Sequence, residues 1–200
     1  MNVLVVFAHP KRDSFSGALL DSFVAGLAES GHEATVADLY REGFDPRFGD
    51  DDLAHFNGHG PAPEEVRAEQ RRLEQADALV FIFPVWWWSF PAMLKGWIDR
   101  VFTGGWAYDY DYTNDKSIGL LKDRPVLMIA SASAGVSTYK KYGFDSAIRA
   151  QIDTGTMAFC GLEKMSIHLL HDVAEDRTIT EAHIATSQAL GRDFPPGENN

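Results

Sequence analysis

The chain has little cysteine and comparatively few basic residues. Cys160 is the single cysteine among 200 residues, which excludes an internal disulfide framework and any site that needs several cysteine ligands. The 18 lysines and arginines stand against 29 aspartates and glutamates, so the formal net charge is −11. A nucleic-acid binder needs a basic face to neutralise phosphates, and this balance argues against nucleic acid as a partner. A local basic pocket for one small anionic ligand remains compatible with it.

Long hydrophobic runs suited to a membrane span are also missing. Residues 78–94 carry no charge, but they fall short of the roughly 20 residues that a span requires, and Pro84 and Pro91 interrupt them. The first residues lack the positively charged start of a signal peptide. We therefore expect a cytoplasmic protein without a membrane span.

Several motifs of well-known enzyme classes are absent. No GxGxxG follows a hydrophobic run, which argues against an independent dinucleotide-binding unit, and no GxxxxGK[ST] is present for ATP or GTP hydrolysis. GxSxG and HExxH are missing too. His55 and His59 lie four residues apart without an evident third ligand, so we expect no metal site.

Five short hydrophobic segments predict the strands of a parallel sheet. Three are nearly continuous, as in strands buried on both faces, and two alternate, as in strands at the sheet edges. The continuous ones are Val3–Ala8, Ala78–Phe83 and Pro125–Ala130, and the alternating ones are Glu33–Leu39 and Lys164–Leu170.

Helical patterns separate these strands. They cover Ser14–Ser30, Pro63–Ala76, Pro91–Phe102, Asp145–Phe159, and a last segment from the capping-box pattern Thr178-x-x-Glu181 to about Arg192. The alternation predicts an α/β fold of flavodoxin-like type, a doubly wound five-stranded parallel sheet in the order 2-1-3-4-5 with helices on both faces. We expect one domain over residues 1–192 and a flexible tail over 193–200. Residues 40–61 form a long connection, either a surface excursion or a lid.

In this strand order the ligand crevice lies outside the carboxyl ends of the first and third strands. The loop after the first strand, residues 9–16, combines hydroxyls and basic residues with the start of a helix, which suits a phosphate. An ordinary helix cap with solvated Lys11 and Arg12 explains the same residues equally well. The loop after the fourth strand, residues 131–139, is small and polar.

The loop after the third strand contains three consecutive tryptophans, Trp86, Trp87 and Trp88. They cannot all point into one core, so at least one should face the crevice as a wall for a planar ring. A hydrophobic dimer surface is the alternative, and both can hold together. A phosphate site beside aromatic walls is the arrangement that a flavin requires.

Two blocks of the sequence carry a resemblance to a known family. His9 with Ser14-Phe15-Ser16, and the stretch FPVWWWSFPAMLKGWIDRVFTGGWAYDY over residues 83–110, resemble the NAD(P)H:quinone oxidoreductase (DT-diaphorase) family of flavodoxin-like flavoproteins. The resemblance extends over about residues 2–161. It implies that the first loop holds the flavin pyrophosphate, that residues 84–88 lie against the isoalloxazine, and that Tyr108 and Tyr110 reach the site of a partner subunit.

The resemblance implies a flavin site built from all three loops. The expected cofactor-binding residues are His9, Ser14, Phe15, Ser16, Pro84, Val85, Trp86, Trp87, Trp88, Ser131, Ala132, Ser133, Ala134 and Tyr139. The expected substrate walls are Trp87, Trp88, Tyr108 and Tyr110.

This chain departs from the family pattern at two places. Ser131-Ala-Ser-Ala134 stands where the family often has Thr-Thr-Gly-Gly, and Asp145 stands where mammalian-type members have a relay histidine. Tyr139, or Tyr142 in its place, is then the expected catalytic proton donor.

The function predicted in this way is reduction of quinones or similar planar acceptors by a cytoplasmic homodimer. FAD, in preference to FMN, is the expected cofactor, and NAD(P)H is the hydride donor. The alternatives are a flavodoxin-type electron carrier, a flavin-binding ancillary subunit of a transporter, and an azo- or nitro-compound reductase.

Overall fold

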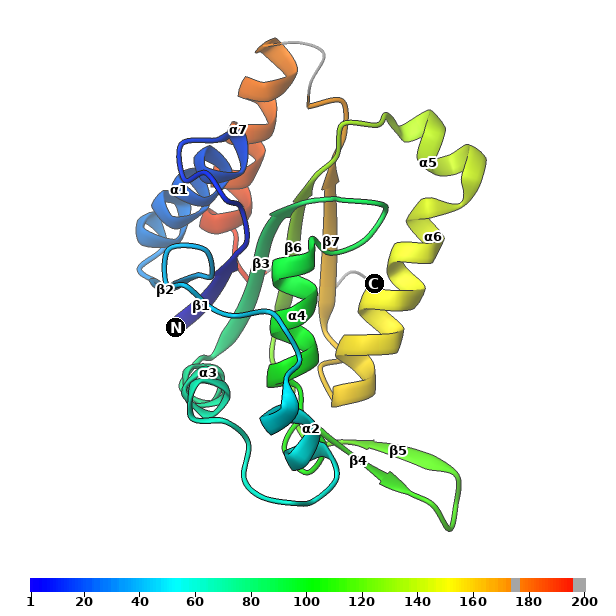
Figure 1. Ribbon diagram of the computed structural model, residues 1–200. Coiled ribbons are helices and arrows are strands. Elements are labelled where there is room, and N and C mark those ends of the chain that lie inside the picture. The colour runs from blue at the N-terminus through cyan, green and yellow to red at the C-terminus, as the bar shows by residue number, and fades with distance from the viewer. Residues whose placement is uncertain (174–176, 196–200) are drawn as a thin grey trace.

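A computed structural model describes residues 1–173 and 177–195 and shows a parallel sheet between two layers of helices (Figure 1). The order of the five strands is β2-β1-β3-β6-β7, which confirms the predicted 2-1-3-4-5 order. The two strands with alternating sequences lie at the edges and are less buried than the three inner strands. The strands are β1 (Asn2–Phe7), β2 (Glu33–Asp38), β3 (Ala78–Pro84), β6 (Val126–Ser131) and β7 (Met165–Leu170).

Each face of the sheet packs against its own set of helices. Helices α1 (Phe15–Glu29) and α7 (Arg177–Arg192) cover one face. Helices α3 (Glu64–Glu74) and α4 (Ala92–Val101) and the segment 144–160 cover the other. Because successive residues of the inner strands point to opposite faces, both faces need apolar side chains, and the strand sequences are continuously hydrophobic.

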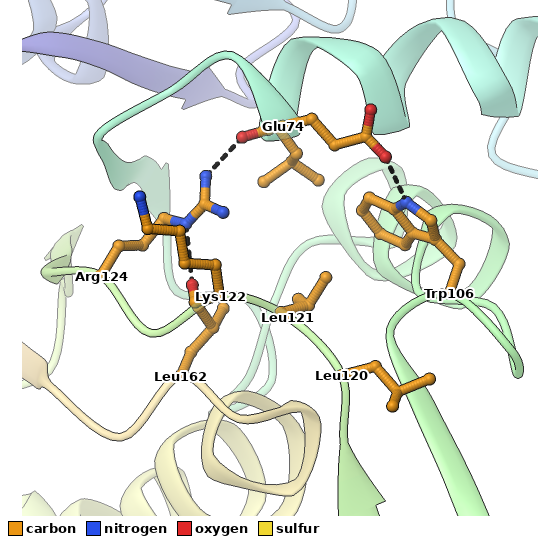
Figure 2. A pocket seen from close by; sticks show the side chains of 8 residues that line it. Glu74, Trp106, Leu120, Leu121, Lys122, Arg124 and Leu162 are labelled. Carbon is orange, nitrogen blue, oxygen red and sulfur yellow. Dashed lines mark hydrogen bonds between the residues drawn. The ribbon is translucent and has the colours of Figure 1, made fainter.

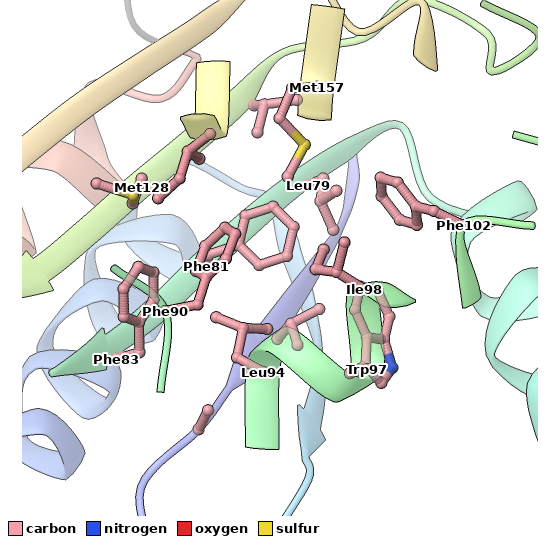
Figure 3. Packing of buried hydrophobic residues seen from close by; sticks show 14 of the residues in the cluster. Leu79, Phe81, Phe83, Phe90, Leu94, Trp97, Ile98, Phe102, Met128 and Met157 are labelled. Atoms are coloured by element: carbon pink, nitrogen blue, oxygen red, sulfur yellow. The ribbon is translucent and has the colours of Figure 1, made fainter. Parts of the chain in front are cut away.

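The larger core lies between the sheet and α4 (Figure 3). Phe81 of β3 packs edge-on against Trp97, with 6.2 Å between ring centroids, and Phe90 packs beside it. Trp97 is fully buried, and its indole N–H donates to Glu69 Oε2 at 2.9 Å, so this large ring enters the core without an unpaired donor.

The segment expected to be one helix over residues 145–159 is broken and begins earlier. Helix α5 (Val136–Tyr142) ends at Gly143, whose φ of 71° lies in the left-handed region that glycine adopts without a steric cost. The chain continues as α6 (Phe144–Ile148), a π-helix, η1 (Arg149–Met157), and a short 3₁₀ turn, η2 (Ala158–Cys160).

A two-stranded hairpin lies outside the main sheet and was not predicted. Its strands are β4 (Tyr108–Asp111) and β5 (Lys116–Gly119), which pair antiparallel. The hairpin projects from the end of the sheet opposite to the loop that follows β3 (Figure 1).

The long connection over residues 40–61 contains helix α2 (Asp50–Phe56) and is fixed to the body of the protein. Arg100 of α4 is buried and donates to both carboxylate oxygens of Asp52 at 3.0 Å. The same guanidinium donates to Glu65 and to the carbonyl of Asp45, both at 2.8 Å. This part of the chain is therefore an anchored excursion, which decides against the lid interpretation.

The C-terminal part differs from its prediction in two ways. Helix α7 begins at Arg177, so Thr178 lies within the helix and is not the N-cap that the capping-box pattern predicted. The packed chain also continues past Arg192, because Phe194 is buried against Phe23 with 6.0 Å between ring centroids. The remainder of the predicted tail, residues 196–200, lies outside the described residues.

Helices α1 and α7 approach each other closely through two glycines. A Cβ on Gly26 would lie 2.1 Å from the carbonyl oxygen of Gln188, and a Cβ on Gly191 would lie 2.2 Å from that of Phe23. The hydroxyl of Ser187 donates to the carbonyl of Leu19 at 2.8 Å inside this contact. Among the described helices, none combines the length and the apolar character that crossing a bilayer requires.

Candidate functional site

Two of the three loops after the inner strands enclose a cavity at the carboxyl end of the sheet. The cavity has a volume of about 140 Å³ and lies between the loops after β3 and β6. Its lining consists of residues that the sequence predicted for the site: Val85, Trp87, Trp88, Ala132, Ser133, Ala134 and Tyr139.

The loop after β1 presents unpaired donors at the start of α1. The Ser14 hydroxyl accepts from the Gly17 N–H at 3.2 Å, which makes Ser14 the N-cap. The backbone N–H groups of Phe15 and Ser16 bond no described acceptor. Ser16 is only 3% exposed, and its hydroxyl also has no partner among the described residues. Unpaired donors at a helix N-terminus suit an anionic group, because the partial positive charge of the helix adds to them.

The basic residues of this loop have different roles. Arg12 donates to the carbonyl of Gly17 at 3.0 Å and pairs with Asp21, so its side chain holds the loop against the helix. His9 contacts the backbone of Lys11 through Nδ1. Arg12 therefore has a structural role in the loop. The exposed Lys11 is the basic residue of this loop that remains available to an anionic ligand.

The tryptophan loop is a tight turn with an uncommon backbone. Trp86 and Ser89 exchange two backbone hydrogen bonds of 3.2 Å, which leaves Trp87 and Trp88 as the central residues of a two-residue turn. Their φ angles are 50° and 61°, a left-handed conformation that bulky residues rarely adopt. Conformations of this kind cost about 1–3 kcal/mol each and cluster at ligand sites.

The three tryptophans have different environments. Trp87 is 92% exposed and stands as an uncovered wall of the cavity, and Trp86 is 42% exposed. Trp88 stacks on Phe144, with 3.7 Å between ring centroids and an interplanar angle of 13°. Phe144 therefore holds the Trp88 ring in place. The sequence did not predict this contact, because the two residues are distant along the chain.

Tyr139 lines the cavity, and Tyr142 does not. Tyr139 is 2% exposed, and its ring lies edge-on to Trp88 at 5.4 Å. Its hydroxyl donates to no described residue, and burial raises the pKa of the phenol, which keeps it protonated. Tyr142 is 60% exposed and lies against Lys141 and Phe144 outside the cavity. Asp145 accepts from the N–H of Ser146 at 2.9 Å at the start of its own helix.

The loop after β6 retains free backbone donors without the glycines of the family. The N–H of Ala132 donates to Leu170 of β7 at 2.8 Å, so it belongs to the sheet. The N–H groups of Ser133 and Ala134 have no described partner and lie at the cavity. In the tryptophan loop the N–H of Val85 is likewise used by the sheet, where it donates to Ser131.

His171 supports this loop and was not predicted for the site. Its Nδ1 lies 3.1 Å from the carbonyl oxygen of Ala134, and its ring is edge-on to Tyr139 with 4.6 Å between centroids. The sequence indicated only a histidine at the end of an edge strand. Its position beside Tyr139 follows from the register of β7 against β6.

Tyr108 and Tyr110 lie far from this cavity within one chain. Both belong to the hairpin at the opposite end of the sheet (Figure 1). The ring of Tyr108 packs against Phe159 at 5.2 Å, and the Tyr110 hydroxyl donates to Asp115, a bond that raises the pKa of Tyr110. The four predicted wall residues therefore form two separate pairs.

Cys160 lies outside the cavity and is buried. Burial raises the pKa of its thiol to about 11, so the thiolate is scarce at neutral pH and the cysteine is unreactive.

The donors present fit a flavin, on the evidence of this chain alone. A phosphate could accept from the N–H groups at the start of α1 and from the Ser16 hydroxyl, and carbonyl oxygens of a planar ring could accept from Ser133 and Ala134. Trp87 supplies an uncovered aromatic surface beside them. These groups lie at the point where the strand order reverses, which is where ligands bind in doubly wound sheets.

Comparison with known proteins connects this arrangement with oxidoreductases. Residues 1–190 match the family model described as a flavodoxin-like fold. An uncharacterized NAD(P)H oxidoreductase of Haemophilus influenzae is 33% identical over 174 residues, which cover 86% of this chain and 85% of the relative. Human ribosyldihydronicotinamide dehydrogenase [quinone] is 33% identical over 210 residues, covering 94% and 90%. The solved NAD(P)H:quinone oxidoreductase from Methanothermobacter marburgensis superposes with a TM-score of 0.89 at 33% identity, covering 96% of this chain and 98% of the other.

Proposed function

Because the chain belongs to the NAD(P)H:quinone oxidoreductase family of flavodoxin-like proteins, we propose that this oxidoreductase uses a flavin and NAD(P)H to reduce quinones or similar planar acceptors. The observation that carries the proposal is the cavity at the strand-order reversal, where Trp87 forms an aromatic wall beside Tyr139, a buried residue whose hydroxyl has no described partner. When bound there, a flavin supplies hydride transfer between NAD(P)H and the acceptor.

The cofactor proposed is FAD. Its phosphates would accept from the start of α1, where the hydroxyl of Ser16 has no described partner and remains open to solvent. Ser16→Ala removes one donor and should weaken flavin binding about tenfold, whereas replacing Ser14 and Ser16 together with acidic residues should weaken it by several kcal/mol through lost donors and repulsion. Unchanged flavin affinity in the double variant would contradict the assignment.

Chromatography of the flavin released from denatured protein identifies the cofactor directly. FAD in a stoichiometric amount is the expected result. FMN would overturn the choice of FAD while leaving the phosphate site at α1 in place, because both flavins carry a phosphate on the ribityl chain.

Tyr139 is the proposed proton donor. Its hydroxyl is held at the cavity by rings on two sides, and because burial raises its pKa, it stays protonated and can stabilise negative charge that develops on a bound ring. His171 fixes the Ala134 carbonyl and packs on Tyr139, so it is proposed as a positioning residue.

A homodimer is proposed to complete the acceptor site. The hairpin carries Tyr108 and Tyr110 away from the cavity of its own chain, so these rings can serve as walls only at the cavity of a second copy. A stable monomer at micromolar concentration with full activity, measured by sedimentation, would contradict this arrangement.

NAD(P)H and the acceptor are both proposed to use the cavity beside Trp87, so they would bind there in turn. The steady-state kinetics should then be ping-pong, with parallel lines in double-reciprocal plots and inhibition at high quinone concentration. Intersecting lines would reject the shared site. Aromatic walls offer little hydrogen-bond discrimination, so a broad range of planar acceptors is expected.

A further inference from the structure

A second and larger cavity lies at the opposite end of the sheet (Figure 2). It has a volume of about 340 Å³ and is enclosed by segments that precede β3, β6 and β7, so the whole sheet separates it from the crevice. Its walls are mainly leucine side chains with one face of Trp106.

Arg124 gives this apolar cavity a buried positive charge. The residue is 9% exposed, and its guanidinium donates to the carbonyl oxygens of Leu73 and Ala76 through Nη1 and to that of Lys122 through Nε. These bonds cap the end of α3. Within residues 1–173 and 177–195, no carboxylate forms an ion pair with Arg124.

One nitrogen of this guanidinium, Nη2, takes no part in these hydrogen bonds. Nη2 donates to no described acceptor, and in Figure 2 it points toward the hollow between Leu121 and Trp106. Among the described residues no buried side-chain nitrogen lacks a partner, so Nη2 is open to solvent, and an anion in the cavity could accept a charge-assisted hydrogen bond from it.

Two further charged residues line the cavity. Lys122 is exposed and has no ion-pair partner among the described residues. Glu74 already accepts from the indole N–H of Trp106 at 2.8 Å, which orients its carboxylate toward the ring. Asp77 also acts electrostatically on Arg124, so the count of nearby charges is balanced, and the preference for an anion comes from the free Nη2 donor and from Lys122.

From these groups we infer a second binding site, distinct from the proposed redox crevice, for a small apolar carboxylate. The carboxylate accepts from Arg124 Nη2 and lies near Lys122, and its apolar body packs between Trp106 and the leucines. Free phosphate fits less well, because it would leave the leucine walls in contact with water. A volume of this size corresponds to a small ligand.

The test follows the five indole N–H signals of ¹⁵N-labelled protein. The signal of Trp106 is assigned with the Trp106→Phe variant, and the protein is titrated with 2-naphthoate and with its neutral isostere 2-naphthamide. We expect 2-naphthoate to shift the Trp106 signal with saturation, and the amide to bind about tenfold more weakly or worse, because it lacks the charge that Arg124 recognises. Added flavin should leave this shift unchanged.

Variants at the rim of the cavity test the site and leave the hydrogen bonds of Arg124 at the end of α3 intact. Lys122→Gln should weaken 2-naphthoate binding several-fold, and Leu120→Trp, which fills the opening from an exposed position, should abolish it. The matched control is Lys116→Gln on the exposed hairpin, which should leave binding unchanged.

Three results would overturn the inference. They are shifts confined to the tryptophans of the crevice, equal affinities for the acid and the amide, and no shift up to about 10 mM, which is weaker than a specific site of this size requires.

Discussion

The polar groups of buried residues have hydrogen-bond partners within the protein at one end of the sheet and lack them at the other. At the amino end, Arg100 finds acceptors in Asp52, Glu65 and the Asp45 carbonyl. At the carboxyl end, Ser16 and Tyr139 are buried residues whose hydroxyls have no described partner and remain open to solvent. A side-chain polar atom buried without a partner costs about 1–3 kcal/mol, and the described residues contain none. Clusters bonded within the protein therefore mark places where the fold is fixed, and hydroxyls left open to solvent mark places where a ligand can bind. Arg124 is the exception at the amino end, and it points into a cavity.

Breaking the satisfied cluster should have the largest effect. Arg100→Met leaves the carboxylate of Asp52 buried and unpaired, so the free energy of unfolding should fall by about 3–5 kcal/mol. Denaturant unfolding measures the change. The control is Arg47→Met, which removes an exposed ion pair with Asp45 and should change stability little. Equal losses in the two variants would mean that the burial of Arg100 contributes nothing.

Removing the hydroxyl of Tyr139 should affect the reaction and leave stability almost unchanged. Tyr139→Phe is expected to slow flavin reduction by roughly tenfold to a thousandfold, the range for one donor to developing charge. Stopped-flow absorbance at the flavin band measures the rate. Because burial raises the pKa of Tyr139, ionisation of this phenol should lower the wild-type rate only at a higher pH than ionisation of an exposed tyrosine would.

Tyr142→Phe is the matched control for this measurement. Tyr142 lies outside the cavity, so its loss should leave flavin reduction nearly unchanged. A normal rate in Tyr139→Phe together with a slow rate in Tyr142→Phe would move the donor to the exposed tyrosine.

Relieving the backbone of the tryptophan turn should produce the smallest effect, and one of opposite sign. Asparagine tolerates the left-handed conformation, so Trp87→Asn should raise the free energy of unfolding by about 1 kcal/mol while it weakens acceptor binding. Trp86→Asn, at a position without a positive φ, should bring no such gain. A destabilised Trp87→Asn variant would show that the exposed ring contributes packing that outweighs the strain.

The sequence predicted the sheet well because its signal is local. Buried inner strands read as continuous hydrophobic runs, and the two alternating strands lie at the edges as expected. The hairpin at residues 108–119 escaped prediction because its strands carry few apolar side chains and bury little. The helix break at Gly143 could not be predicted, because a single glycine in a sequence does not reveal that its φ angle is left-handed.

For the site, the sequence indicated the loops but not the contacts between them. Trp87, Trp88, Ser133, Ala134 and Tyr139 follow strands whose order places them together, so their convergence could be predicted. The supporting contacts of Phe144 and His171 depend on how distant segments pack, and no local pattern carries that information.

The close contact of α1 with α7 also sets an order of events during synthesis. The first of these helices ends at Glu29, and its partner is not complete until Arg192, so at 5–20 residues per second about 8–30 s pass between them. Through that interval the side of the first helix that faces α7 lacks its partner, while its other side can already pack on β1 and β3. We therefore expect chaperone capture of nascent chains that end before residue 177, and cofactor uptake only after the completed chain is released.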